Sequence, residues 1–140
     1  EYSVAADVWS ATSFKALHQD ALAAERWNRL HPNEDPRRPY VLECLEETDG
    51  PIVAATDYVK ALPETVGRWL CERYTTLGTD GFGRSDGRPA LRAFFEVDAA
   101  HIVLATLDQL AKDGEIDMGA VAKAIEKLGI DPEKPEPVRA

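Results

Sequence analysis

The chain has 140 residues, with 25 acidic and 16 basic side chains, so its formal net charge is −9. This acidic balance argues against a general nucleic-acid binder, which needs clustered lysine and arginine to displace counterions from phosphates. No stretch approaches the roughly 18 consecutive apolar residues of a membrane span. The two cysteines, Cys44 and Cys71, are too sparse for a disulfide framework or a zinc knuckle, and both thiols are expected to be buried and unreactive.

The N-terminal part of the chain predicts a strand followed by a long helix. Residues 4–10 read VAADVWS, an apolar and partly alternating run that favours a strand. Thr12 or Ser13 can then cap a helix by accepting a hydrogen bond from an unpaired backbone N–H. Pro32 ends this helical region. Apolar residues at helical spacing form its predicted buried face: Phe14, Leu17, Ala21, Ala24 and Trp27.

Two further strands are predicted in the middle of the chain. Pro39 suits the first turn of a short helix that continues through Leu45. Ile52–Ala55 is a continuous apolar run, which is typical of a strand buried on both faces. A short helical patch follows, interrupted by Pro63, and Tyr74–Leu77 is the third predicted strand. Strands that alternate with helices favour an α/β layered fold with a mainly parallel sheet.

Helices dominate the prediction for the C-terminal part. Ser85 or Asp86 is expected to cap a helix whose first turn holds Pro89, while Asp98 and Asp117 are expected to cap two more. Gly129 suits a left-handed position at the end of the last helix. We assign residues 1–130 to one domain. The remaining tail, 131–140, has little to bury and should be weakly ordered unless it is docked.

A polar, glycine-rich loop at residues 78–87, GTDGFGRSDG, follows the third predicted strand. Ligands of open α/β sheets bind at the carboxyl ends of strands, so this loop is the first candidate site. Its glycines at 81, 83 and 87 have the spacing GxGxxxG rather than GxGxxG. One interpretation is a phosphate cradle with Arg84 and Arg88 as charge partners. The other is a connecting loop whose glycines permit tight turns and whose Asp86 caps a helix.

Other kinds of catalytic or metal site find little support in the sequence. His18, His31 and His101 lie far apart, without the HxxxH or HExxH spacing of metal ligands. The serines lack the GxSxG elbow, although a Ser-His-Asp triad assembles in space and stays open. The residues alone therefore lead to an acidic α/β domain of undetermined function.

Six longer strings occur in order through the chain: DVWSATSF (7–14), ERWNRLHP (25–32), RPYV (38–41), ATDYVK (55–60), LGTDGFGRSD (77–86) and FFEVDAAHIV (94–103). Together they resemble the C-terminal region of the homodimeric bacterial pyruvate dehydrogenases, and the likeness extends through the closing GIDPEKPEPV. This resemblance implies a three-layer α/β/α fold like the transketolase C-terminal domain, with the opening central strand and helix missing from this chain. Since the chain opens with Glu1 rather than Met, we expect a piece of a longer enzyme.

The resemblance implies a cytoplasmic, homodimeric oxidoreductase that uses thiamine diphosphate and magnesium. Such an enzyme decarboxylates pyruvate and passes the two-carbon unit to the lipoyl group of dihydrolipoyl acetyltransferase. The family's GDG and paired-asparagine motif for magnesium diphosphate has no counterpart here. The resemblance therefore places no catalytic, cofactor-binding or metal residue in this chain, and implies no nucleic-acid or membrane partner.

The leading hypothesis is a non-catalytic part of pyruvate dehydrogenase that packs against the other domains and supports the dimer. Its expected contact with a neighbouring domain is the loop 79–86, through five residues: Asp80, Phe82, Arg84, Ser85 and Asp86. The missing strand is expected to lie between residues 4–9 and Ile52–Ala55. The alternative hypothesis is a stand-alone acidic α/β binding module with an anion-binding glycine loop at 81–87.

Overall fold

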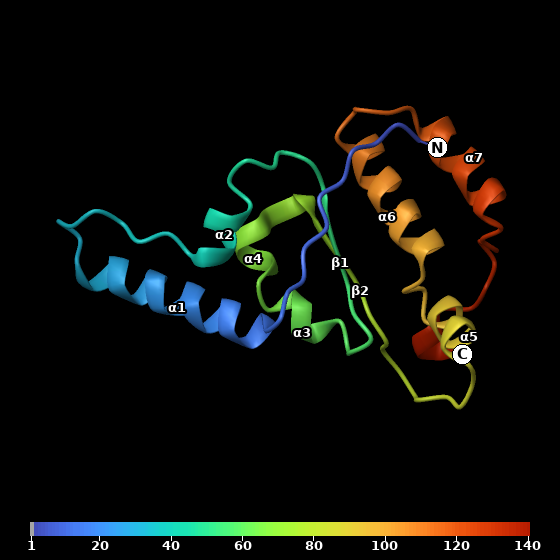
Figure 1. Ribbon diagram of the computed structural model, residues 1–140, viewed down its shortest axis with the longest axis horizontal. Coiled ribbons are helices and arrows are strands. Elements are labelled where there is room, and N and C mark those ends of the chain that lie inside the picture. The colour runs from blue at the N-terminus through green and yellow to red at the C-terminus, as the bar shows by residue number, and fades with distance from the viewer. Residues whose placement is uncertain (1) are drawn as a thin grey trace.

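A parallel strand pair lies at the centre of the computed structural model, which describes residues 2–140 (Figure 1). Strand β1 (Ile52–Ala55) pairs with β2 (Tyr74–Leu77), so that Ile52 lies opposite Tyr74 and Ala55 lies opposite Leu77. Parallel strands need a long crossover, and residues 56–73 supply it. Both predicted strands are confirmed.

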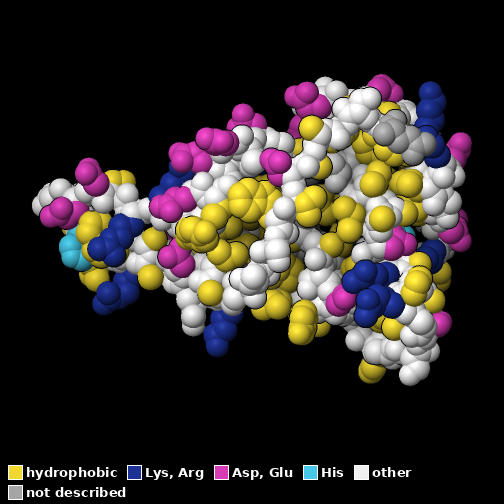
Figure 2. Space-filling view, in the orientation of Figure 1, with side chains coloured by type: hydrophobic (Ala, Val, Ile, Leu, Met, Phe, Trp, Pro, Cys, Tyr) yellow, Lys and Arg dark blue, Asp and Glu magenta, His cyan; other side chains and the backbone are white. Residues whose placement is uncertain are grey.

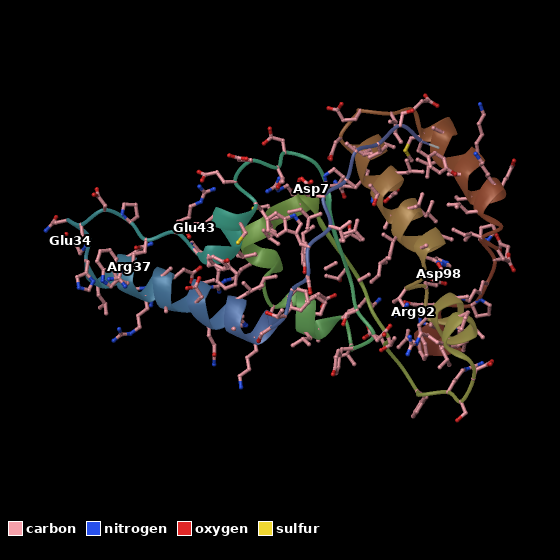
Figure 3. The ribbon with its side chains drawn as sticks, viewed as in Figure 1. Asp7, Glu34, Arg37, Glu43, Arg92 and Asp98 are labelled. Atoms are coloured by element: carbon pink, nitrogen blue, oxygen red, sulfur yellow. The ribbon has the colours of Figure 1, made fainter. Side chains whose placement is uncertain are left out.

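Helix α1 (Phe14–Leu30) begins at Ser13, whose hydroxyl accepts the N–H of Ala16. This confirms one of the two predicted caps. The far half of α1 and its return loop project from the body as an arm, with Glu34 and Arg37 near its end (Figures 1 and 3). The side chain of Asn28 holds the loop by bonding both the N–H of Arg37, at 2.7 Å, and its carbonyl, at 2.9 Å. Trp27 stacks between the His31 ring and the Arg37 guanidinium.

One hydrophobic cluster packs the N-terminal helices onto the sheet. Its buried residues are Val41, Val66 and Leu70, and Ile52 and Tyr74 from the strands pack against them. Val41 lies in α2 (Tyr40–Cys44), while Val66 and Leu70 lie at the start and end of α4 (Gly67–Leu70). Two further short elements flank α4 in the chain, α3 (Ala61–Glu64) and the 3₁₀ turn η1 (Cys71–Arg73). Glu25 joins helix α1 to this group. Its carboxylate accepts the indole N–H of Trp69 at 2.8 Å and pairs with Arg68.

A second cluster lies in the C-terminal half, which comprises α5 (Arg88–Phe94), α6 (Ala99–Lys112), α7 (Met118–Leu128) and the 3₁₀ turn η2 (Pro137–Arg139). Leu107, Val121 and Ala124 form its buried centre between α6 and α7. The predicted caps Asp98 and Asp117 are confirmed, since each carboxylate accepts a backbone N–H of the first turn. Gly129 adopts the expected left-handed conformation, with φ 67°.

The layer order of the prediction is confirmed, although the sheet is short. The first cluster packs against the two strands, and helix α6 of the C-terminal half also contacts β1. Within residues 2–140, however, β1 and β2 pair only with each other. The expected burial of β1 on both faces is not reached, because Ile52, Val53 and Ala54 are only half-buried and Ala55 is exposed. No helix in this part of the chain is long and apolar enough to cross a membrane.

The predicted strand at residues 4–10 is wrong. This segment has no strand pairing, and its Val8 and Trp9 side chains are 96% and 61% exposed. A strand needs a neighbouring backbone to accept and donate hydrogen bonds, and here none pairs with the segment. It is held instead at its two ends, by Tyr2 against the second cluster and by the cap of α1 at Ser13. It does not pair with β1, so the expectation of a missing intervening strand stays open.

Two smaller expectations are also corrected. Helix α5 begins at Gly87 without a side-chain cap, because the Asp86 carboxylate accepts the N–H of Gly87 itself. Pro89 lies in the first turn as expected. Cys71 is exposed rather than buried; it follows α4 directly as the first residue of η1, with φ 56°, while Cys44 is half-buried.

Replacement of Asp98 by alanine is expected to lower the free energy of unfolding by about 1 kcal/mol at neutral pH, because the cap of α6 is lost. Partial burial favours the neutral acid, but hydrogen bonds from the His101 N–H and ring and from the Ala100 N–H lower the Asp98 pKa overall. A lowered pKa stabilises the fold above the unfolded value and loses this effect as pH falls through the folded one. Urea unfolding at about pH 7 and about pH 3 should therefore show a smaller difference in acid. An equal difference at both would contradict the electrostatic part.

The parent protein is expected to lose folding stability at alkaline pH, and replacement of Tyr74 by phenylalanine should remove this loss. Burial, with a smaller effect of the Glu64 charge, raises the pKa of Tyr74 to about 12. Its hydroxyl donates to the Pro63 carbonyl at 3.0 Å. Because an unfolded tyrosine ionises near pH 10, stability should fall as pH rises from about 10 to about 12. Unfolding curves across this window test the change, and the exposed Tyr58→Phe variant, which should retain the loss, is the control.

Candidate functional site

The carboxyl ends of β1 and β2 bring two loops together, residues 56–60 and 78–87. The backbone N–H of Thr79 donates to the Tyr58 carbonyl at 2.9 Å, and the Thr79 hydroxyl donates to the Asp57 carbonyl at 2.8 Å. In parallel sheets this edge is where ligands bind. The sequence placed the second loop here, and the strand register joins it to the first.

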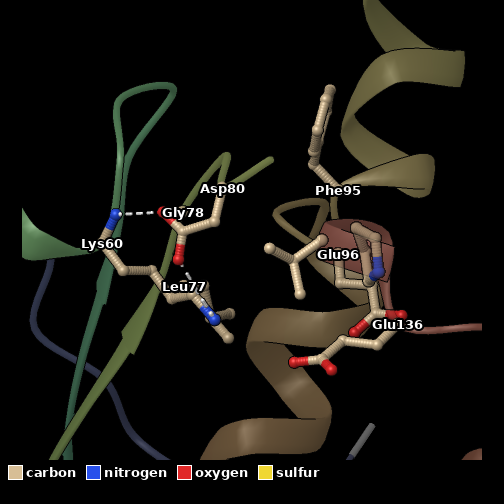
Figure 4. Close-up of a pocket in the computed structure, with 9 residues that line it drawn as sticks. Lys60, Leu77, Gly78, Asp80, Phe95, Glu96 and Glu136 are labelled. Carbon is tan, nitrogen blue, oxygen red and sulfur yellow. Dashed lines mark hydrogen bonds and ion pairs between the residues drawn. The ribbon is translucent and has the colours of Figure 1, made fainter. Parts of the chain in front are cut away.

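Asp80 binds the first loop rather than solvent. One carboxylate oxygen accepts the backbone N–H of Lys60 at 2.9 Å, and the other lies 3.6 Å from the Lys60 ammonium (Figure 4). Both side chains are about one-third exposed, so solvent screens much of the ionic attraction. The carboxylate therefore serves mainly to join the two loops, and it is already occupied by donors from this chain.

Gly78 allows the loops to approach. A Cβ atom at this position would lie 2.8 Å from the Tyr58 carbonyl oxygen and 2.9 Å from the Lys60 nitrogen, closer than real Cβ contacts. Glycine is required here by space, since its backbone is adjacent to two backbone groups of the neighbouring loop. The sequence showed a glycine-rich loop, but not which glycine was constrained.

A further ion pair at this edge was missed by sequence reasoning. Arg92 of α5 makes two hydrogen bonds to Asp57, at 3.3 and 3.0 Å. This hydrogen bonding, together with the charge of Asp57, raises the pKa of the Arg92 guanidinium. The only local signal was an acidic residue two positions after the end of a predicted strand. Its partner lies 35 residues away, a distance over which helical spacing indicates nothing.

The outer part of the loop is exposed. Phe82 is 90% exposed, and Ser85 is also on the surface. The Arg84 guanidinium lies 3.8 Å from the centre of the Phe94 ring, a cation–π arrangement that holds the loop on α5. Of the five predicted contact residues, Asp80 faces inward, Asp86 bonds its neighbour Gly87, and the others lie along the loop. Whether this loop contacts another domain stays a prediction.

The anion-cradle interpretation is disfavoured by these contacts. Arg84 faces an aromatic ring, and the Gly87 N–H already donates to the Asp86 carboxylate at 2.6 Å. The C-terminal tail covers the loop at Gly81, because a Cβ there would lie 3.1 Å from the Val138 Cα. An anion in this loop would have to displace these groups and accommodate nearby carboxylates.

A cavity of about 100 Å³ lies between the loops, the end of α5 and the tail (Figure 4). It is smaller than the roughly 300 Å³ at which small-molecule pockets begin. Two carboxylates on its wall are paired within the chain, Glu96 with Lys134 and Glu136 with Arg139. Across residues 2–140, no group of three or more His, Cys, Asp or Glu side chains is placed to hold a metal ion.

The three histidines lie in separate parts of the fold. His18 lies beside the Trp69 ring, His31 stacks on Trp27, and the His101 ring nitrogen lies 2.7 Å from the Asp98 carboxylate. Each has a local structural partner. Among the described residues, the structure brings no histidine together with a serine and an acid.

Replacement of Gly78 by alanine should separate the two loops and lower the free energy of unfolding by about 1–3 kcal/mol, the range for overpacked sites. Gly83 is the matched control, since a Cβ there meets no atom within 4 Å. The Gly83→Ala variant should stay within about 0.5 kcal/mol of the parent. Urea unfolding of both variants measures the difference, and equal stability of the two would contradict the close approach.

Comparison with known proteins shows which family this chain is similar to. Residues 1–98 match the transketolase-like TK C-terminal domain family. The chain is 52% identical over 139 residues to the pyruvate dehydrogenase E1 component of Pseudomonas aeruginosa, covering 99% of this chain and 16% of the relative. The Escherichia coli K12 protein of the same name is 51% identical over 138 residues, covering 98% of this chain and 15% of the relative. For Mycobacterium tuberculosis the identity is 46% over 131 residues, 94% of this chain and 14% of the relative.

The chain thus spans about one-sixth of the length of these curated relatives and matches their C-terminal region. The likeness to them continues beyond residue 98 into α6 and α7. Since the family match covers 98 of 140 residues, the chain belongs to the transketolase-like TK C-terminal domain family.

Proposed function

We propose that this chain is the C-terminal, non-catalytic part of a pyruvate dehydrogenase E1 component, an oxidoreductase of the cytoplasm. The observation that carries the proposal is 52% identity across 99% of the chain to a relative of which it forms only 16%. The whole enzyme would decarboxylate pyruvate and reductively acetylate the lipoyl group of dihydrolipoyl acetyltransferase. This chain would pack against the remaining domains and support a homodimer.

The residues at the carboxyl ends of β1 and β2 do not fit thiamine diphosphate with magnesium. The cavity at the strand ends is about 100 Å³, and the charged groups around this edge bind one another: Lys60 with Asp80, and Arg92 with Asp57. A diphosphate and its cation would need these groups free and converging on one point. We therefore assign the cofactor to the rest of the enzyme and no chemical step to this chain.

A packing role is supported by apolar surface that the described residues leave uncovered. Hydrophobic side chains run along the middle of the face in Figure 2. Val8 and Trp9 are largely exposed, and the apolar strand β1 is only half-buried. Extended apolar surface of this kind marks interaction sites. We propose that another part of the enzyme supplies a strand beside β1, between it and residues 4–9, so that the unpaired edge of the sheet gains hydrogen-bond partners.

The loop 79–86 is the proposed contact with a neighbouring domain. Phe82 would be its apolar anchor, because a side chain that is 90% exposed gains most from burial in a partner. Arg84 holds the loop on Phe94, and Ser85 offers a hydroxyl on the same surface. The inward contacts of Asp80 and Asp86 would keep the loop in one conformation.

In the whole enzyme, Arg84→Ala is expected to weaken the dimer by about tenfold or to lower the rate of pyruvate decarboxylation, as loss of an arginine at an interface does. Sedimentation measures the dimer, and carbon dioxide release measures the rate. Arg26→Ala is the control, because Arg26 is exposed on α1 far along the chain from the loop. Unchanged dimer stability and rate in the Arg84 variant would refute the contact.

A further inference from the structure

The ammonium group of Lys134 contacts three acceptors that lie far from it in sequence. It donates to the carbonyls of Ala93 and Phe94 at 2.9 and 2.7 Å, and it lies 3.1 Å from the Glu96 carboxylate. A lysine ammonium has three N–H donors, so each has one acceptor. Carbonyls in the last turn of a helix lack intrahelical partners, and a cation there also matches the helix dipole. Lys134, which lies in the tail, therefore caps the C-terminal end of α5.

Glu96 explains why this end of α5 needs support. Its φ is 61°, in the left-handed region that side chains other than glycine and asparagine rarely adopt. Glycine usually occupies such a position after a helix. Here the Glu96 carboxylate is held by Lys134, and both side chains are partly shielded from solvent. The ion pair offsets an unfavourable backbone conformation.

The tail also contacts the glycine-rich loop. The Phe94 ring is approached by Arg84 from the loop, at 3.8 Å, and by Lys134 from the tail, at 5.5 Å. Val138 lies directly against Gly81, where a Cβ would be 3.1 Å from the Val138 Cα and where a φ of 96° would strain any side chain. The tail thus touches the loop directly at Gly81 and indirectly through Phe94. Its own shape is set by Asp131, whose carboxylate accepts the Glu133 N–H at 2.9 Å.

We propose that residues 131–140 are a strap that holds the loop 78–87 against α5, and that Lys134 is the positioning residue that fastens it. The tail meets the loop directly at Gly81 and, through the Phe94 ring, at Arg84, and these two loop residues flank the exposed Phe82 in sequence. Release of the tail would open the cavity at Asp80 and allow the loop to move. All of these contacts lie within this chain, so the strap does not require the proposed dimer contact.

Amide hydrogen exchange, followed by mass spectrometry in the whole enzyme, tests the strap. Lys134→Met keeps a long side chain and removes the three donors. Peptides covering residues 78–87 and 131–140 should exchange about tenfold faster, because charge-assisted hydrogen bonds to the end of α5 are lost. Peptides from α1 should not change. Lys123→Met, at an exposed position on α7, is the matched control and should leave both regions as in the parent.

Two outcomes would overturn the proposal. Faster exchange in the tail with an unchanged loop would show a docked tail that restrains nothing, and no change in either region would show that Lys134 does not fasten it. If Lys134→Met raises exchange throughout the enzyme, Val138→Ser separates local from global effects, because Val138 is partly exposed and lines the cavity together with Gly78 and Asp80 of the loop. That variant should accelerate the tail and residues 78–81, and an unchanged loop there would equally overturn the strap.

Discussion

The parallel pairing of β1 with β2 holds together two halves that otherwise have separate hydrophobic cores. One core lies among the N-terminal helices and the other lies between α6 and α7, and the strands are placed between them. The register of the pair also sets the positions of the loops that follow each strand. Thr79 and Asp80 can bond the first loop, and Gly78 can lie against it, only because Leu77 lies opposite Ala55. A slip of one residue would reverse the faces of the strand and separate these groups.

Features encoded within a few residues could be predicted from the sequence. The caps at Ser13, Asp98 and Asp117 follow from a side-chain oxygen placed before a helical repeat, and Gly129 follows from its freedom to adopt positive φ. Of the two confirmed strands, Ile52–Ala55 is a short apolar run, and Tyr74–Leu77 combines aromatic and β-branched residues with a leucine. Residues 4–10 had a comparable local pattern but no backbone to pair with, and pairing is a property of the whole sheet rather than of the segment.

The site was predictable as a place but not as a set of contacts. The loop at the end of the last strand was identified from its glycines and its position. Its stabilising partners were not, because Asp57 meets Arg92 across 35 residues, and Lys134 meets Phe94 across 40. Such contacts depend on how helices are placed around the sheet. The same placement explains why the charged groups at this edge of the sheet are not available to a ligand, since they pair with one another.

The arm formed by α1 and its return loop has a consequence for motion. The ring of Trp27 lies between a histidine ring and a guanidinium, and Asn28 bonds both backbone groups of Arg37. These contacts are internal to the arm, so its far end does not depend on the central cores for its shape. Thermal motion should then swing the arm as a rigid lever about the point where Glu25 meets Trp69, instead of unravelling it from the tip.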